Sequence, residues 1–297
     1  MLGKVRRKEP PAEVDFRAFR KAILPPAKPD IIQWLETNRT LRGAHAGPWR
    51  REWCKWAVEI IRACVDRRTR VVVVRGASQI AKTESLILNV WAYRTVFDPA
   101  PAMMVLPSQT AAQDFSHQRI ETLINSCPPL KAVVSSRGTG PRTEGASTID
   151  FKTYAGGFLE LVGTLSASEL SQVAVRDLYM TEVDRYAVET ENKEGSPLHL
   201  AKLRQRIFRH TSKLVMECSP TIAGESRIEL EYQAGSQEHY FLPCPVCGFE
   251  QELLKPGFDW ESATYCCSNC GGSSPQKAWL SRVGSLDRFR KRFRDHS

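Results

Sequence analysis

The sequence predicts an α/β fold in which a central, mostly parallel sheet is flanked by helices and followed by a small C-terminal zinc ribbon. Three observations predict this fold. Short apolar runs alternate with stretches of helical periodicity, a glycine-containing turn with a Lys-Thr pair joins one run to a helix, and two Cys-x-x-Cys pairs follow the last run.

The expected strands are short and rich in β-branched or apolar residues, beginning with a run of four valines. They lie at 71–74, 102–106, 158–162, 173–180 and 213–218. The expected helices show helical spacing of apolar residues and lie at 49–64, 83–96, 109–125 and 197–210. Because parallel strands need crossover connections, this alternation predicts a parallel sheet with helices on both faces. A Gly/Ser/Thr-rich loop is expected from 135 to 148.

The composition is that of a globular protein with a basic balance. Hydrophobic residues make up 42% and charged residues 25%, and no apolar run reaches the roughly 18 residues of a transmembrane helix. The basic N-terminus lacks the apolar segment of a signal peptide, so the chain is expected to stay in the cytoplasm. Lys and Arg exceed Asp and Glu by 42 − 33 = 9, which favours a polyanionic partner such as nucleic acid.

The segment VVVVRGASQIAKTE has the order of a phosphate-binding P-loop, as in P-loop NTPases. Gly76 permits the turn, Lys82 neutralises the β- and γ-phosphates, and Thr83 is the expected Mg²⁺ ligand. Ala81 stands where a second glycine is usual, and its methyl group is expected to narrow the site. The expected ATP-binding residues are Gly76, Ala77, Ser78, Gln79, Ile80, Ala81, Lys82 and Thr83. The alternative is an ordinary strand-to-helix turn.

A P-loop ATPase also needs a second strand that ends in acidic residues, and VRDLYMTEVD has that pattern. Glu182 is the expected base that orients the attacking water. The metal-organising Asp expected one residue earlier is Thr181, whose hydroxyl would hold a metal-bound water only weakly. Asp177 and Asp184 are alternative carboxylates. The alternative for Glu182 is a surface acid after a core strand.

Nine cysteines are unevenly distributed, and five of them fall near the C-terminus. Cys244 and Cys247 form one Cys-x-x-Cys-Gly knuckle, and Cys267 and Cys270 form another after nineteen intervening residues. This spacing predicts a zinc ribbon with four thiolate ligands, in which Zn²⁺ is structural because no coordination position stays open. Cys266 is the spare thiol, since its use would break the spacing.

In combination these motifs resemble the lambda-type (GpA-like) phage terminase large subunit. The matching stretches follow the order of that family and are HAGPWR, SQIAKTE, MVLPSQTAAQDFSHQRI, TLSASELSQVAVRDLYMTEVDRY, SPLHLAKLRQRIF, ECSPTIAGESRIELEY, HYFLPCPVCGFEQEL and YCCSNCGG. The resemblance covers roughly residues 30–275. The order of several dissimilar motifs is more specific than any one motif.

The resemblance implies an ATP hydrolase that couples hydrolysis to translocation of double-stranded DNA into a procapsid. It implies that Lys82 and Glu182 are catalytic and that Ser219, Pro220 and Thr221 couple hydrolysis to movement. The implied partners are double-stranded DNA, a small terminase subunit and the portal of a procapsid, with self-association on the portal left open. No membrane partner is implied, and the implied location is the cytoplasm of the host cell.

The resemblance also divides the chain into four parts: an N-terminal arm (1–47), a P-loop ATPase domain (48–235), a zinc-ribbon element (236–275) and a basic tail (276–297). The family's nuclease domain has no counterpart in these parts, so no nuclease activity is expected. The alternative function is a truncated, catalytically impaired prophage remnant that binds nucleotide or DNA without turnover, which Thr181 favours. A third reading is a helicase-like ATPase of another class.

Three arginines near the motifs are candidates for an arginine finger that stabilises the transferring phosphoryl group. They are Arg75, Arg185 and Arg227. The alternative for each is a solvated surface side chain. If the missing acid limits turnover, Thr181→Asp is expected to raise activity.

Overall fold

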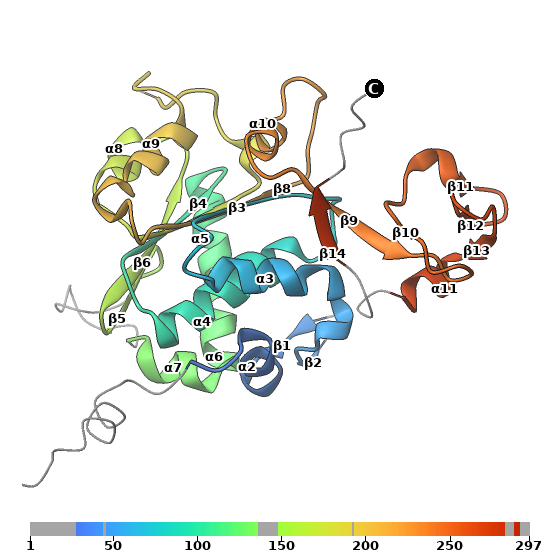
Figure 1. Ribbon diagram of the computed structural model, residues 1–297. Coiled ribbons are helices and arrows are strands. Elements are labelled where there is room, and N and C mark those ends of the chain that lie inside the picture. The colour runs from blue at the N-terminus through green and yellow to red at the C-terminus, as the bar shows by residue number, and fades with distance from the viewer. Residues whose placement is uncertain (1–27, 44–45, 136–147, 192, 283–287, 292–297) are drawn as a thin grey trace, which may run out of the picture.

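The computed structural model of the protein describes residues 28–43, 46–135, 148–191, 193–282 and 288–291. Its centre is a six-stranded sheet (Figure 1). In spatial order the strands are β3 (Val71–Arg75), β8 (Lys213–Cys218), β7 (Asp177–Thr181), β4 (Ala102–Leu106), β6 (Gly157–Gly163) and β5 (Phe151–Tyr154). The first five run parallel and β5 pairs antiparallel with β6, which confirms the predicted mostly parallel α/β sheet.

Helices cover both faces of the sheet (Figure 1). On one face lie α2 (Ile31–Asn38), α3 (Val58–Val65), α4 (Asn89–Phe97), α5 (Gln109–Phe115), α6 (Glu121–Ser126) and α7 (Pro128–Val133). On the other lie α8 (Ala167–Ser171), α9 (Pro197–Leu203) and α10 (Arg227–Gln233). Alternate strand residues serve the two faces: Met104 belongs to the first core and Met103 to the second. Strands β4, β7 and β8 are therefore buried along their whole length, as central parallel strands are.

Most of the expected elements are observed, with three differences. The helix expected over 197–210 ends at Leu203, and a separate 3₁₀ turn follows at Arg206–Phe208. The expected helix over 49–64 begins as two 3₁₀ turns, η2 (Arg51–Trp53) and η3 (Lys55–Ala57), and becomes α-helical only at α3. Cys54 separates the turns with a non-helical backbone, φ −145° and ψ 53°. The expected strand over 173–180 starts only at Asp177, because the backbone N–H of Val175 bonds instead to the carbonyl of Arg204.

Two predicted helices contain π-helical segments. The helix after β3 begins with η4 (Thr83–Leu88) before α4, and η5 (Ser116–Ile120) joins α5 to α6. Further short elements are the pair β1 (Thr40–Leu41) and β2 (Gly47–Pro48) and the 3₁₀ turns η6 (Val183–Arg185), η7 (Arg206–Phe208) and η8 (Lys255–Gly257). Most of the loop expected from 135 to 148 lies outside the described residues. Among the described residues, no helix has both the length and the apolar character needed to cross a membrane.

The C-terminal part is a small element beside the main sheet (Figure 1). Its strands are β9 (Glu238–Pro243), β10 (Glu250–Gln251), β11 (Phe258–Asp259), β12 (Thr264–Cys266), β13 (Ser273–Pro275) and β14 (Arg288–Lys291), with one helix, α11 (Gln276–Leu280). It has its own small core, formed by Leu242, Cys244, Tyr265, Cys267 and Trp279. Two of these five residues are cysteines, so the apolar part of this core is very small.

A buried ion pair fixes the amino end of β7 against α4. Both carboxylate oxygens of Asp177 accept hydrogen bonds from the Arg94 guanidinium, each at 2.8 Å, and both residues are buried. This contact occupies the carboxylate at the end of β7 opposite to Glu182. The alternative that Asp177 supplies the metal carboxylate is therefore wrong.

Asp177→Ala is expected to destabilise the fold by about 3–5 kcal/mol, because the buried Arg94 guanidinium loses its two-oxygen partner and keeps the longer contact of 3.3 Å to the Asp98 carboxylate. The free energy of unfolding in urea measures this. Asp114→Ala, on the exposed side of α5, is the control and is expected to change that free energy by less than about 0.5 kcal/mol. Equal stability of the two variants would contradict the prediction.

Candidate nucleotide-binding site

The candidate site lies where three neighbouring parallel strands end. The loop beginning at Gly76 follows β3, Ser219 follows β8, and Glu182 follows β7. Because β8 lies between β3 and β7, the segments that the sequence singled out meet at one edge of the sheet. The carboxyl edge of an open parallel sheet is the usual place for a ligand.

The loop after β3 is held to the neighbouring strand and exposes its tip. The backbone N–H of Gly76 donates to the carbonyl of Cys218 at 3.2 Å. A Cβ atom at Gly76 would lie 3.2 Å from Ile80 Cδ1 and 3.3 Å from Lys82 Cδ, so glycine keeps the loop compact. Ala77, Ser78, Gln79 and Ala81 are exposed, as expected for a loop that presents its backbone to a ligand.

Ala81, the residue in place of the second glycine, has the left-handed conformation that glycine adopts readily. Its φ is 60°, as is that of Gln79. A left-handed backbone at a non-glycine residue stores strain on the order of 1 kcal/mol. The residue itself is exposed. Alanine at position 81 therefore strains the loop backbone, while the backbone keeps the left-handed conformation that glycine would adopt there.

Lys82 folds back toward the loop and β8. Its Nζ donates to the carbonyl of Ala77 at 2.6 Å and to Ser219 Oγ at 3.0 Å, and the residue is only 7% exposed. The ammonium group therefore joins the loop to the first residue of the segment Ser219–Thr221. An anion that binds the loop would compete with these two neutral acceptors for the ammonium group.

A buried carboxylate that the sequence analysis missed stands beside the expected metal ligand. Glu217 on β8 accepts hydrogen bonds through Oε1 from the hydroxyl of Thr83, at 2.7 Å, and from the hydroxyl of Thr181. Thr181 and Glu217 are register partners on the adjacent strands β7 and β8. The available signal was an acidic residue inside the apolar run LVMEC, two residues before Ser219.

Glu182 follows β7 in a strained conformation. Its φ is 56° and its ψ is 43°, and its backbone N–H donates to the carbonyl of Glu217 at 2.9 Å. Its carboxylate is 3.1 Å from Arg185, and the side chain is 47% exposed. A left-handed glutamate costs on the order of 1–3 kcal/mol and occurs mainly at functional sites. Its backbone bond fixes it to the strand that carries Glu217.

Asp184 joins the turn after β7 to the segment Ser219–Thr221. Its Oδ2 accepts hydrogen bonds from the backbone N–H and the hydroxyl of Thr221, and its Oδ1 accepts one from the N–H of Ile228 at the start of α10. Burial by itself raises the pKa of Asp184, but these donors outweigh it and lower the pKa. Asp184 therefore acts as a link between segments.

The three candidate arginines are held by contacts within the chain. Arg75 pairs with Glu229 and lies over the ring of Tyr232, with 4.2 Å from Cζ to the ring centroid. Arg227 donates to three carbonyl oxygens in the turn between β7 and α9, those of Val183, Tyr186 and Ala187. Arg185 is the most exposed and pairs with Glu182.

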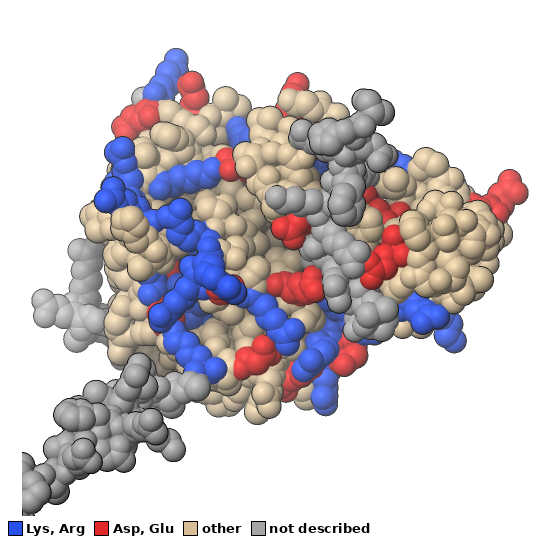
Figure 2. Space-filling view, viewed as in Figure 1, with Lys and Arg blue, Asp and Glu red and all other residues tan. Residues whose placement is uncertain are grey.

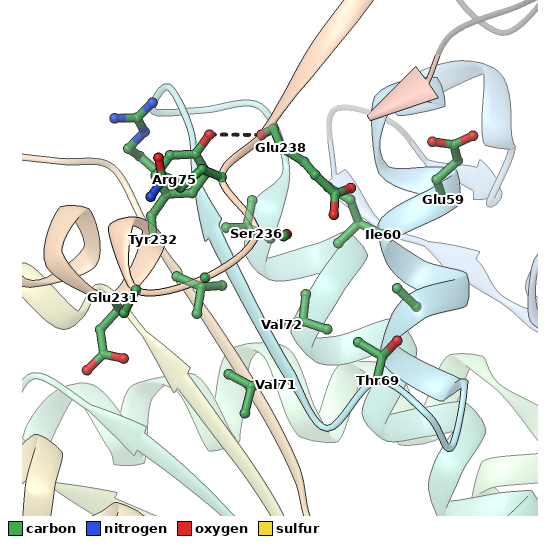
Figure 3. Close-up of a pocket in the computed structure, with 16 residues that line it drawn as sticks. Glu59, Ile60, Thr69, Val71, Val72, Arg75, Glu231, Tyr232, Ser236 and Glu238 are labelled. Atoms are coloured by element: carbon green, nitrogen blue, oxygen red, sulfur yellow. Dashed lines mark hydrogen bonds between the residues drawn. The ribbon is translucent and has the colours of Figure 1, made fainter. Parts of the chain in front are cut away.

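A separate cavity of about 450 Å³ lies along the outer edge of β3 (Figure 3). Residues from α3, β3, α10 and the turn leading to β9 line it, including Val71, Val72 and the carboxylates Glu59, Glu231 and Glu238. None of the loop residues 76–83 lines this cavity. Apolar walls and nearby carboxylates do not suit a triphosphate, so we place the candidate phosphate site at the loop.

The four predicted zinc ligands converge in the C-terminal element. The sulfur atoms of Cys244, Cys247, Cys267 and Cys270 all lie within 4.8 Å of one another. Two of the sulfur pairs are 3.8 and 4.0 Å apart, close to the separation of about 3.8 Å that a tetrahedron with Zn–S bonds of about 2.3 Å requires. Cys266 is exposed and is not part of the cluster. The donor set therefore fits Zn²⁺.

A mostly parallel sheet with a lysine-bearing loop at its carboxyl edge is the arrangement of an α/β nucleotide-binding domain. The chain belongs to the family described as phage terminase large subunit gpA, ATPase domain, whose model matches residues 43–285. This confirms the family that the motifs indicated.

Two curated relatives are similar to the chain. It is 24% identical over 269 residues to the large terminase subunit of Enterobacteria phage P21, covering 84% of this chain and 40% of that protein. It is 24% identical over 247 residues to the large terminase subunit of Escherichia phage lambda, covering 80% of this chain and 36% of that protein. The chain thus spans two fifths or less of the length of these relatives.

Among solved structures, the HK97 bacteriophage large terminase is similar in fold. The TM-score is 0.51 at 12% sequence identity, covering 68% of this chain and 40% of the other. At this identity the likeness concerns the fold alone.

Proposed function

We propose that this chain is the ATPase motor part of a terminase large subunit and couples ATP hydrolysis to translocation of double-stranded DNA into a procapsid. One observation carries the proposal. The segment Ser219–Thr221 is bonded at one end to Lys82 of the phosphate loop and at the other to Asp184 in the turn that follows Glu182. The two parts that bind and hydrolyse ATP are thus joined through one short segment.

In the proposed mechanism, the backbone of residues 76–83 and the Lys82 ammonium hold the triphosphate, and Glu182 orients the attacking water. Mg²⁺, when bound, neutralises phosphate charge, and Thr83 is its proposed protein ligand. When Lys82 turns to the phosphate, Ser219 loses the hydrogen bond that it accepts from Nζ. The change passes along Ser219–Thr221 to Asp184 and α10, which gives hydrolysis a physical route to movement.

Basic side chains support double-stranded DNA as the partner. Five exposed arginines lie in the turns that precede β3 and β8, and they are Arg67, Arg68, Arg70, Arg206 and Arg209. The Arg70 guanidinium donates to the carbonyl of Arg209, so the two turns adjoin. Figure 2 shows Lys and Arg side chains gathered in a band across this face of the molecule. Such a surface binds phosphates independently of sequence.

A small terminase subunit and a portal remain proposed partners by family likeness, as does self-association on that portal.

Lys82→Ala is expected to lower DNA-stimulated ATP hydrolysis by about 100-fold, because it removes the positive charge opposite the transferring phosphate. Phosphate release with and without double-stranded DNA measures this. Lys131→Ala, on an exposed lysine of α7, is the control and should match the unaltered protein. A flat assay in the unaltered protein, or equal rates in the Lys82 and Lys131 variants, would refute the motor proposal.

The second candidate function is a catalytically impaired protein that binds nucleotide or DNA without turnover. The specific observation that favours it is Thr181 at the position of the expected metal-organising acid. This candidate predicts nucleotide binding that depends on Lys82 together with no phosphate release, even with double-stranded DNA present.

The cysteine cluster is proposed to hold a structural Zn²⁺ through Cys244, Cys247, Cys267 and Cys270. The proposed boundaries remain an arm at 1–47, an ATPase domain at 48–235, a zinc-ribbon element at 236–275 and a tail at 276–297. Parts of the arm and of the tail lie outside the described residues.

A further inference from the structure

Glu217 is a carboxylate in an unusual place for a charge. It is 2% exposed, in the middle strand of the three that form the site, and every residue of that strand is buried. Among the described residues, no Lys, Arg or His nitrogen forms an ion pair with Glu217. Because an ionised carboxylate is costly to bury without a cation, this residue points to a cationic ligand.

The contacts of Glu217 indicate which cation. Its Oε1 accepts hydrogen bonds from the hydroxyl of Thr83, the proposed Mg²⁺ ligand, and from that of Thr181, which stands where the metal-organising acid is expected. The three side chains place two hydroxyl oxygens and a carboxylate together. Oxygen donors with a single negative charge suit Mg²⁺ that is also bound by phosphate.

We propose that Glu217 supplies the carboxylate of the magnesium site, taking over from β8 the role that Thr181 on β7 cannot fill. As a positioning residue, it accepts a hydrogen bond from the Thr83 hydroxyl, which would leave the oxygen lone pairs of Thr83 free to hold the cation. Its charge offsets that of the cation. This inference rests on the proposed ATPase function, and it removes the main reason for regarding the protein as impaired.

The carboxylate can come from β8 in place of β7 because Thr181 and Glu217 are register partners on these adjacent strands. A carboxylate on either strand reaches the same point between β7 and β8, and a hydroxyl on the other can donate to it. Thr181→Asp alone would put two carboxylates together in a buried place. It is therefore expected to lower the activity, contrary to the expectation from the sequence.

Titration of ADP into the full chain in Mg²⁺ and in EDTA tests the proposal by calorimetry. Mg²⁺ is expected to tighten ADP binding to the unaltered protein by about 10-fold or more. This is the factor by which the loss of an outer-shell partner of a metal ligand typically weakens metal binding. Glu217→Gln keeps the shape and loses the charge, so it should bind ADP normally in EDTA and show no gain in Mg²⁺. Glu160→Gln, on the distant strand β6, is the control and should keep the full gain.

A strand swap gives the reciprocal test. The double variant Thr181→Asp/Glu217→Thr returns the carboxylate to β7 and is expected to recover the Mg²⁺ gain. If Glu217→Gln does not fold, as judged by its melting transition, the swap carries the test alone. A full Mg²⁺ gain in Glu217→Gln, or a folded swap variant without one, overturns the proposal. ADP binding that is absent from the unaltered protein in both buffers overturns the ATPase function itself, which is a distinguishable result.

Discussion

Replacing Glu182 with glutamine is expected to reduce ATP turnover by about 100- to 10,000-fold, the range typical of a lost general base. Glutamine has nearly the same shape but does not take a proton from the attacking water. Since Glu182 contacts neither Lys82 nor Thr83 through any hydrogen bond found in the described residues, nucleotide binding should persist. Single-turnover phosphate release and ADP titration, done side by side, measure the two quantities.

The matched control for this prediction is Glu189→Gln, an exposed glutamate a few residues beyond the same turn. It loses the same charge without touching the end of β7, so its turnover should equal that of the unaltered protein. Turnover in Glu182→Gln within a few fold of this control would show that the catalytic base lies elsewhere. Loss of ADP binding together with turnover would instead make Glu182 a structural residue of the site.

Removal of zinc is expected to unfold the C-terminal element while leaving the central sheet intact. Zn²⁺ bound by four thiolates contributes on the order of 10 kcal/mol to local folding. The core of the described part of the element has three buried apolar residues, Leu242, Tyr265 and Trp279, beside two of the cysteine ligands. Tyr240 and Leu253 pack against it while partly buried. A core of this size does not fold on its own. Hydrogen exchange after chelation should therefore rise across residues 238–280 and stay unchanged in β4, β7 and β8.

Cys267→Ser tests the same site without a chelator, and Cys266→Ser is its neighbouring control. Cys267 belongs to the cluster, whereas Cys266 is exposed and outside it. We expect about one zinc per chain by elemental analysis in the Cys266 variant, as four thiolates bind one ion, and little in the Cys267 variant. Equal zinc content in both, or slow exchange in the element after complete chelation, would rule out a structural metal at these thiols.

The two kinds of site differ in how far the sequence predicted them. The four cysteines of the cluster were predicted correctly. Each Cys-x-x-Cys pair lies within four consecutive residues, and the occurrence of two such pairs separated by nineteen residues is typical of a single four-cysteine site. The segment predicted to be the phosphate loop lies, as expected, at the junction of β3 and η4, although the left-handed backbone of Ala81 was not foreseen; its binding of phosphate stays a prediction. By contrast, Glu217 was missed, because an acid within an apolar strand carries no short motif.

Taken alone, the sequence determined the alternation of strands and helices, hence a parallel sheet, and set the limits of β4 and β8 without error. These signals lie within a few residues of one another, where local preference and the period of apolar positions decide. Only the tertiary structure decided that β8 lies between β3 and β7. That order brings Glu217 between Thr83 and Thr181 and leaves Asp177 bound to Arg94 at the opposite end of β7. Strand order and register depend on contacts between residues far apart in the chain, which periodicity does not record.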